Sequence, residues 1–293
     1  MLRKRSKYFI YAAIGAAAFL LIYGTDALHV TFDGWILNGY VEEDIIQHYA
    51  GWMAFRASDW SFPVGLAGSL GYPDGVVISF TDSIPLVSVF FKCLSGILPE
   101  TFQFFGWYVL FCFMMQGICA GLLMELFTEK KWGIYGAVVL FVFSPILIER
   151  AFRHTALASQ WLILAALYLY FHSRRSGKTP WGFWGLQVLC VGLHPYFVPM
   201  VCGVLAAWTL EHLLKGPGAE RKKAAGKTAR ENLTGYAGKK AYFHQPEKEC
   251  ADRPVTGSYR RPAYGAVIGA FLHQRKGYVP VRFPQGPVYH QHQ

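Results

Sequence analysis

Residues 102–127 read FQFFGWYVLFCFMMQGICAGLLMELF, and Glu125 is the one charged residue among them. The hydrocarbon core of a bilayer is about 30 Å thick, and a helix needs about 20 mostly apolar residues to cross it. This stretch meets that requirement. With loosely defined ends allowed, four further segments do so: Tyr8–Tyr23, Trp132–Ile148, Leu157–Phe171 and Trp181–Leu210. The sequence therefore predicts an all-α polytopic membrane protein.

Composition agrees with this prediction and removes one functional class. Apolar residues make up 53% of the chain and charged residues 16%, which is more apolar than a water-soluble core requires. A formal net charge of +10 would be consistent with nucleic-acid binding, but the charge is not evenly distributed along the chain. Residues 1–215 hold 14 basic and 13 acidic residues, whereas residues 216–293 hold 14 and 5. The excess charge belongs to the tail, so we expect no nucleic-acid partner.

A change of character near residue 216 divides the chain. We expect a transmembrane domain over residues 1–215 and a basic tail of low order over residues 216–293, where Gly, Lys, Arg, Pro, His and Gln dominate. The one apolar island of the tail, Ala263–Leu272, is too short to span a bilayer. Two interpretations of the tail stay open: a disordered basic extension, or a non-native end produced by a frame shift.

The segment Ile84–Leu98 decides the topology, because it is short, contains Lys92 and is bounded by prolines. Lys and Arg accumulate in cytoplasmic connections. If the segment spans, two of the basic clusters fall outside; if it does not, all three lie on one side, at residues 3–7, 130–131 and 174–178. We favour the second arrangement. It makes residues 24–83 an outer loop, on the same face as the turn 149–159.

The outer loop is unusually acidic. Between residues 26 and 82 it holds eight carboxylates and one cation, Arg56. Within it, an apolar stripe at helical spacing predicts an amphipathic helix over Val41–Ala57 that lies along the membrane surface, with its aromatic residues among the headgroups. Asp44 and His48 fall one turn apart on its other side.

This Asp–His pair has more than one interpretation. It can act as a general base, as an ion pair or as half of a divalent-metal site, or it can serve only to keep the helix in water. Two ligands alone do not form a metal site. We therefore assign no metal ligand from the sequence, and a divalent metal cofactor stays open.

A second polar cluster, Glu149–His154, lies between two apolar segments. Charged residues at membrane depth are costly unless they are paired or hydrated. The planar guanidinium groups of Arg150 and Arg153 match phosphate oxygens, so this turn is suited to bind a lipid phosphate. The alternative is that both arginines anchor a helix end by extending to the interface.

A third feature lies inside the last predicted span. Pro195 predicts a kink in that helix, because proline cannot donate the intrahelical hydrogen bond. His194, directly before it, is as consistent with a buried structural histidine as with a ligand.

Three motifs resemble those of a bacterial family of multi-spanning membrane proteins: EDIIQHYAGW at 43–52, YPDG at 72–75 and SFTDSIPL at 79–86. The stretch from Ser144 to His154 completes the likeness, which covers about residues 8–212. That family is itself similar to the GT-C glycosyltransferases, which use polyprenyl-phosphate sugars. GT-C enzymes usually have more spans and often a soluble C-terminal domain, so this chain is expected to be a fragment or an incomplete enzyme.

The resemblance implies a GT-C-like helical bundle in the bacterial cytoplasmic membrane, with surface-lying helices in its first outer loop. It implies that Asp44 is the catalytic carboxylate, with Glu43 as a less favoured substitute, and that a lipid-linked sugar donor and membrane lipids are the partners. The implied substrate-binding residues are His48, Arg56, Arg153 and His154. Two other classes stay open: a lipid or solute transporter or flippase component, and a non-catalytic membrane protein.

Overall fold

The computed structural model describes residues 2–38 and 44–215, and these residues are mainly helical. Five of their segments are long and apolar enough to cross a membrane, which is the pattern of a membrane protein. These segments are Ser6–Tyr23, Phe105–Glu125, Lys131–Arg153, Thr155–Ser176 and Phe197–Leu214. The prediction of an α-helical membrane protein is confirmed at this level.

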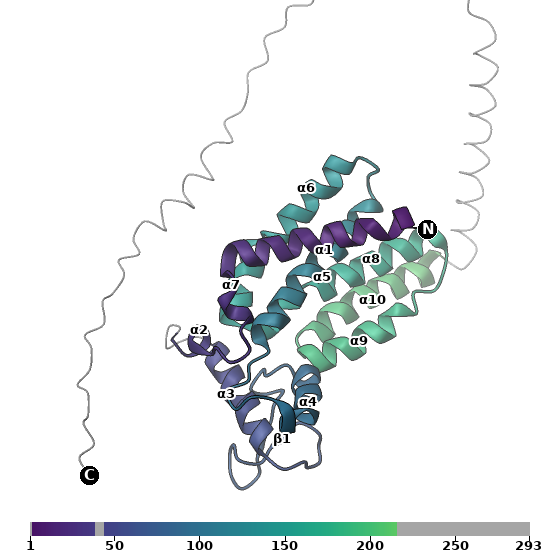
Figure 1. The fold of residues 1–293 in the computed structure, drawn as a ribbon. Coiled ribbons are helices and arrows are strands. Elements are labelled where there is room, and N and C mark those ends of the chain that lie inside the picture. Colours follow the sequence, from purple (N-terminus) through teal and green to yellow (C-terminus); the bar gives the residue numbers. More distant parts are fainter. Residues whose placement is uncertain (1, 39–43, 216–293) are drawn as a thin grey trace, which may run out of the picture. The chain divides into compact units, whose positions relative to one another are not determined.

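The long helices lie side by side in a bundle (Figure 1). Their bounds are α1 Leu2–Tyr23, α5 Phe105–Glu125, α6 Lys131–Val142, α8 Trp161–Ser176, α9 Gly182–Leu193 and α10 Phe197–Lys215. The nine-residue helix α7, Pro145–Arg153, follows α6 at one end of the bundle. Helices α1, α6 and α8 all pack against α5, and α10 packs against α8 and α9. Helix α5 is therefore the one around which the first part of the bundle is built.

Helices α1 and α5 approach closely because glycine lies at their interface. A Cβ at Gly15 would overlap the backbone of Phe113, and a Cβ at Gly117 would overlap the carbonyl oxygen of Tyr11. Small residues of this kind let two helix backbones touch, and lipid-exposed helices rely on such packing because lipid offers no hydrophobic driving force between them.

One end of the bundle collects the basic segments. Lys7 pairs with Glu125, so the start of α1 lies beside the end of α5. The ring centroids of Phe127 and Phe171 are 5.0 Å apart, which brings the end of α8 to the same place. We call this the basic end, because the segments that carry the three basic clusters meet there: residues 3–7, 130–131 and 174–178.

The predicted span Trp181–Leu210 is two helices, so the prediction of one kinked helix is wrong. Helix α9 ends at Leu193 and α10 begins at Phe197, and the two form a hairpin (Figure 1). Between them His194 is extended, with φ −159° and ψ 122°. The ring of a proline disfavours the α conformation at the residue before it, which ends α9 here.

Residues 24–38 and 44–104, which we call the region 24–104, lie between α1 and α5 in the chain and at the end of the bundle where α7 lies (Figure 1). Its described elements are short: η1 Asp26–Leu28, α2 Gly34–Leu37, α3 Asp44–Ala57, β1 Leu66–Ala67, β2 Val76–Val77, α4 Pro85–Cys93 and η2 Ser95–Ile97. Strands β1 and β2 pair antiparallel. Helix α4 has nine residues, which gives a length of about 14 Å. The segment Ile84–Leu98 is therefore too short to cross a bilayer, as the favoured arrangement requires.

Helix α3 carries the predicted apolar stripe, but the stripe faces protein. Ile45, Trp52 and Phe55 are buried, and the Trp52 indole donates a hydrogen bond to the carbonyl of Phe102 at 3.0 Å. Tyr49 is buried as well. The expectation that these aromatic residues lie among lipid headgroups is therefore wrong, because they form the core that joins α3 to the rest of the region.

Candidate functional site

Five polar side chains from four separate segments meet at the end of the bundle opposite the basic end. We call them the His–Asp cluster: Asp44 and His48 of α3, Asp82, His154 and His194. Asp82 lies in the turn before α4, His154 follows α7, and His194 lies between α9 and α10. The four segments are far apart in the sequence, so only the fold brings these side chains together.

Asp82 lies at the centre of the cluster. Its Oδ1 is 3.0 Å from His194 Nε2, and its Oδ2 is 3.4 Å from His154 Nε2. The centroid of the His154 ring is 4.7 Å from that of His48 and 5.4 Å from that of His194, edge to face in both cases. Asp44 Oδ2 lies 3.8 Å from His154 Nε2. The Asp82 carboxylate thus bridges two imidazoles, and His154 lies against every other member.

Exposure rises across the cluster from one side to the other. His48 and His194 are 0% and 1% exposed. The side chains of His154, Asp82 and Asp44 are 12%, 25% and 56% exposed. The cluster is therefore closed at His48 and open to its surroundings at Asp44, which is where a ligand can approach.

The turn that carries Asp82 has an unusual backbone conformation. Asp82 has φ 52° and Ile84 has φ 54°, in the left-handed region that residues with a Cβ rarely adopt. Ser83 Oγ donates to the carbonyl of His48 at 2.7 Å and lies 2.8 Å from Thr81 Oγ1. Such strain costs about 1–3 kcal/mol per residue and clusters at functional sites. The hydroxyl bonds hold the turn directly on the helix that carries His48.

Gly51 permits the turn to dock on α3. A Cβ at this position would lie within 3.0 Å of Thr81 Oγ1 and Ser83 Oγ. Gly51 follows His48 by one turn of the helix, so the close approach occurs directly beside the cluster. Glycine in the middle of a helix is otherwise unfavourable. Here the close approach of the turn explains it, because a residue with a Cβ would not fit.

A hydrogen bond from the backbone fixes the orientation of the His194 ring. The backbone N–H of Tyr196 donates to His194 Nδ1 at 3.2 Å. Since Nδ1 accepts a hydrogen bond, the ring proton of the neutral imidazole lies on Nε2, which faces Asp82 Oδ1. The Nε2 side of His194 therefore faces the central carboxylate, with Nε2 3.0 Å from Asp82 Oδ1.

Burial sets the charge of two members. Burial, and then the neighbouring His154 ring, lower the pKa of His48 to about 3, so its imidazole is neutral at pH 7. Burial by itself would raise the pKa of Asp82, but hydrogen bonds from His154 and His194 outweigh it and hold that pKa well below its usual range. The cluster therefore combines an anionic carboxylate with a buried neutral imidazole.

Three of the six residues predicted from the sequence lie together here: Asp44, His48 and His154. Arg153 is next to His154 in the chain, and its Nε lies 2.8 Å from Glu149 Oε1 on the surface of α7. Glu43, predicted as a less favoured substitute for Asp44, lies outside the described residues, as does Val41, the first residue of the predicted stripe.

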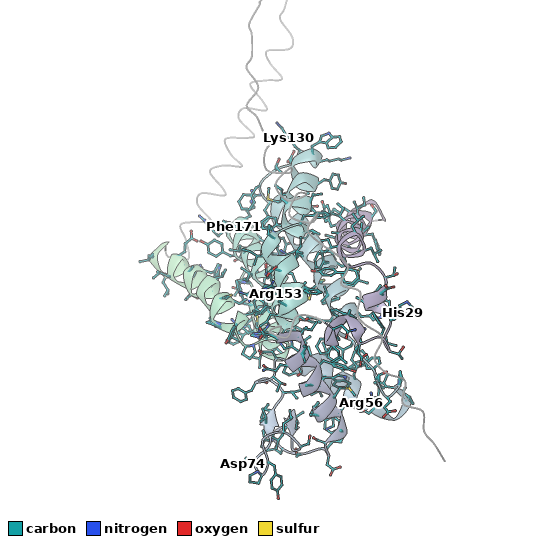
Figure 2. All side chains as sticks on the ribbon, turned by 90° about the vertical axis from the view of Figure 1, so that its left-hand side faces the viewer. His29, Arg56, Asp74, Lys130, Arg153 and Phe171 are labelled. Carbon is teal, nitrogen blue, oxygen red and sulfur yellow. The ribbon has the colours of Figure 1, made fainter. Side chains whose placement is uncertain are left out.

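Arg56 lies elsewhere, although it was predicted to bind substrate. Its guanidinium group donates to four backbone carbonyls in the segment 95–100, at distances of 2.7 to 3.3 Å. In Figure 2 it stands well apart from Arg153. Lys92 acts similarly, since its Nζ donates to the carbonyls of Phe55 and Ser58 at 2.7 and 2.8 Å. Both cations therefore stabilise the region 24–104 through hydrogen bonds to its own backbone.

Sequence reasoning did not assign a role to Asp82 or to His194. A local signal for each exists, because Asp82 lies three residues before Pro85, which begins α4, and His194 lies directly before Pro195, which ends α9. Residues at such breaks stand at the end of a helix, where a polar side chain escapes the apolar bundle. These prolines mark where Asp82 and His194 lie in the sequence, but they do not show which side chains the two residues contact.

Together, the fold and the cluster define an α-helical membrane protein with a histidine–aspartate site at one end of its bundle. The chain belongs to the family described as Domain of unknown function (DUF6311), whose family model matches residues 12–234. Neither the curated proteins nor the solved structures contain a match to it.

Proposed function

We propose that this chain is a membrane glycosyltransferase-like protein, or a fragment of one. It transfers a sugar from a polyprenyl-phosphate donor to an acceptor hydroxyl at the outer face of the bacterial cytoplasmic membrane. The observation that carries the proposal is the approach of Asp44 Oδ2 to His154 Nε2 at 3.8 Å. The acidic outer loop and the polar turn, which the likeness to GT-C enzymes associates with acceptor and donor, thereby share one site.

The distribution of charge supports the orientation. Cytoplasmic connections of membrane proteins collect Lys and Arg, so the basic end faces the cytoplasm and the His–Asp cluster lies at the outer face. The hairpin of α9 and α10 supports this multi-pass arrangement, because it returns the chain from His194 to the basic end. The salt bridge between Arg174 and Glu211, at 3.0 Å, joins α8 and α10 there.

Asp44 is the proposed catalytic base. It accepts the proton of the acceptor hydroxyl while that oxygen attacks the anomeric carbon of the donor sugar. The bond between the anomeric carbon and the phosphate oxygen breaks at the same time, and its electron pair leaves with the polyprenyl phosphate. The exposure of Asp44 suits this role, because an acceptor must reach the carboxylate from outside the cluster.

The polar turn stabilises the leaving phosphate. His154 donates a hydrogen bond to the developing charge, and Arg153 at the end of α7 adds a planar cation that matches phosphate oxygens. His48 is fully buried behind His154. We therefore assign His48 a positioning role in place of the direct substrate contact that the sequence suggested.

The test compares two substitutions of aspartate by asparagine, which keeps the shape of the side chain but cannot take up a proton. Membranes containing each variant are supplied with radiolabelled polyprenyl-phosphate sugars, and transfer is measured. We expect Asp44→Asn to lower transfer by at least about a hundredfold. Asp74→Asn alters an exposed acid at the far tip of the region 24–104 (Figure 2) and leaves transfer unchanged. Equal transfer by Asp44→Asn and the wild type, or none by the wild type with any donor, contradicts the proposal.

A further inference from the structure

Three members of the His–Asp cluster have the chemistry of a metal centre. His48, Asp82 and His154 each offer one ligand atom, and these atoms lie within 4.8 Å of one another. Ligands of a tetrahedral zinc ion lie about 3.3 Å apart, because each is about 2.0–2.1 Å from the metal. The distance of 3.4 Å between Asp82 Oδ2 and His154 Nε2 already matches that separation.

His48 supplies an independent observation. Its ring is fully buried, and within residues 2–38 and 44–215 neither ring nitrogen has a hydrogen-bond partner. A buried polar group without a partner costs about 1–3 kcal/mol. The ring nevertheless lies against His154, 4.7 Å between centroids, so it stands beside the other two ligands. A metal ion bound to one of its nitrogens would remove part of this cost.

We propose that His48, Asp82 and His154 bind a divalent transition-metal ion of the zinc class. Two imidazoles and one carboxylate suit Zn²⁺ and its transition-metal neighbours, whereas Ca²⁺ and Mg²⁺ prefer sites made of oxygen. This proposal does not depend on the sugar-transfer function, since binding of the metal can be measured without any substrate.

The other two members of the cluster, His194 and Asp44, have roles that are consistent with a metal site. His194 engages Asp82 Oδ1 at 3.0 Å and leaves Oδ2 for the metal, as outer partners of metal-bound carboxylates do. Three protein ligands leave a coordination position open for a water or a substrate oxygen. Asp44, the most exposed member, lies 3.8 Å from His154 Nε2 and is close enough to accept a proton from a molecule bound beside it.

The experiment measures zinc binding to the purified full chain in detergent after removal of metal by EDTA. Bound zinc is counted by mass spectrometry, affinity is obtained by competition with a chromophoric chelator, and Co²⁺ is used as a spectroscopic probe of nitrogen and oxygen ligands. We expect one site that His48→Ala, Asp82→Asn and His154→Gln each weaken by at least about tenfold. Mg²⁺ does not displace the bound zinc.

His29→Ala is the matched control, because His29 is an exposed histidine of the same region (Figure 2). It keeps the affinity of the wild type. If His48→Ala does not fold, the two variants that nearly preserve side-chain size, Asp82→Asn and His154→Gln, decide the question. The proposal is overturned if the wild type binds zinc no more tightly than these variants. Zinc bound at this site by a chain that transfers no sugar rejects the proposed function and leaves the metal site standing.

Discussion

Replacing Gly51 by alanine tests how the His–Asp cluster is held together. Gly51 lies inside α3, and in an unconstrained helix its replacement by alanine would stabilise the helix by about 1 kcal/mol. Here the added Cβ would lie within 3.0 Å of two hydroxyl oxygens, Thr81 Oγ1 and Ser83 Oγ. Helix propensity and packing therefore predict effects of opposite sign, and the sign of the measured change decides between them.

The packing effect is the larger one because the turn cannot move freely. Ser83 Oγ donates to the carbonyl of His48 at 2.7 Å, and Thr81 Oγ1 donates to that of Ile78 at 3.1 Å. Displacing the turn breaks both bonds, at about 1 kcal/mol each, and overpacking adds about 1–3 kcal/mol. After subtraction of the gain in helix propensity, Gly51→Ala should lower the free energy of unfolding by about 2–4 kcal/mol.

The assay is thermal unfolding of the detergent-solubilised chain, followed by tryptophan fluorescence, since Trp52 is buried on the same helix. Gly136→Ala is the matched control, because Gly136 also lies inside a helix and a Cβ there meets nothing within 4 Å. We expect the control to unfold no earlier than the wild type. A Gly51→Ala chain as stable as the wild type, or more stable, would refute the packing of the turn on α3.

Two further predictions concern the region 24–104. Lys92→Met removes three hydrogen bonds to backbone carbonyls, at 2.7, 2.8 and 3.4 Å, and should lower the free energy of unfolding by about 2–4 kcal/mol. A loss no greater than that of Lys131→Met, at an exposed position, contradicts this. Burial, and then the carboxylate of Asp33, raise the pKa of Tyr49 to about 12. The stabilisation from this group is complete below pH 10 and is lost as the pH rises through 12, so Tyr49→Phe should lose less stability over that window in a pH series of thermal melts. Parallel losses in both chains count against this assignment.

The helices could be predicted because their signal is local. Apolar stretches such as Phe102–Phe127 are long enough to require a helix in lipid, and α5 lies within that stretch. The failure at Trp181–Leu210 has a physical reason. Apolar residues continue on both sides of Pro195, so hydropathy does not distinguish a kinked span from a hairpin, and only the packing of α10 on α8 selects the hairpin.

The site could be predicted only in part. Asp44 and His48 are one helical turn apart, so their proximity follows from the sequence. Their contact with His154 depends on tertiary structure, and the sequence suggested it only through the expectation that both segments lie on one face. Pro85, three residues after Asp82, marks the break before α4, but nothing in the sequence shows that His154 and His194 are the partners of Asp82.

Arg56, which was predicted among the substrate-binding residues, lies apart from the cluster. Its partners are carbonyl groups of the segment 95–100, which no sequence pattern reveals. Backbone acceptors carry no side-chain signature. A lone cation in an acidic loop can therefore be structural even where the composition makes it conspicuous.

The central claim is that the His–Asp cluster lies at the outer face and the basic end in the cytoplasm. Lys130 and Asp74 stand at opposite ends of the described part of the chain (Figure 2) and serve as reporters. Each is replaced by cysteine in a chain whose native cysteines are serine, and intact cells are treated with a membrane-impermeant maleimide. We predict labelling of Asp74→Cys in intact cells and of Lys130→Cys only after permeabilisation. Labelling of both positions from the same side, or of Lys130→Cys alone in intact cells, would contradict the account.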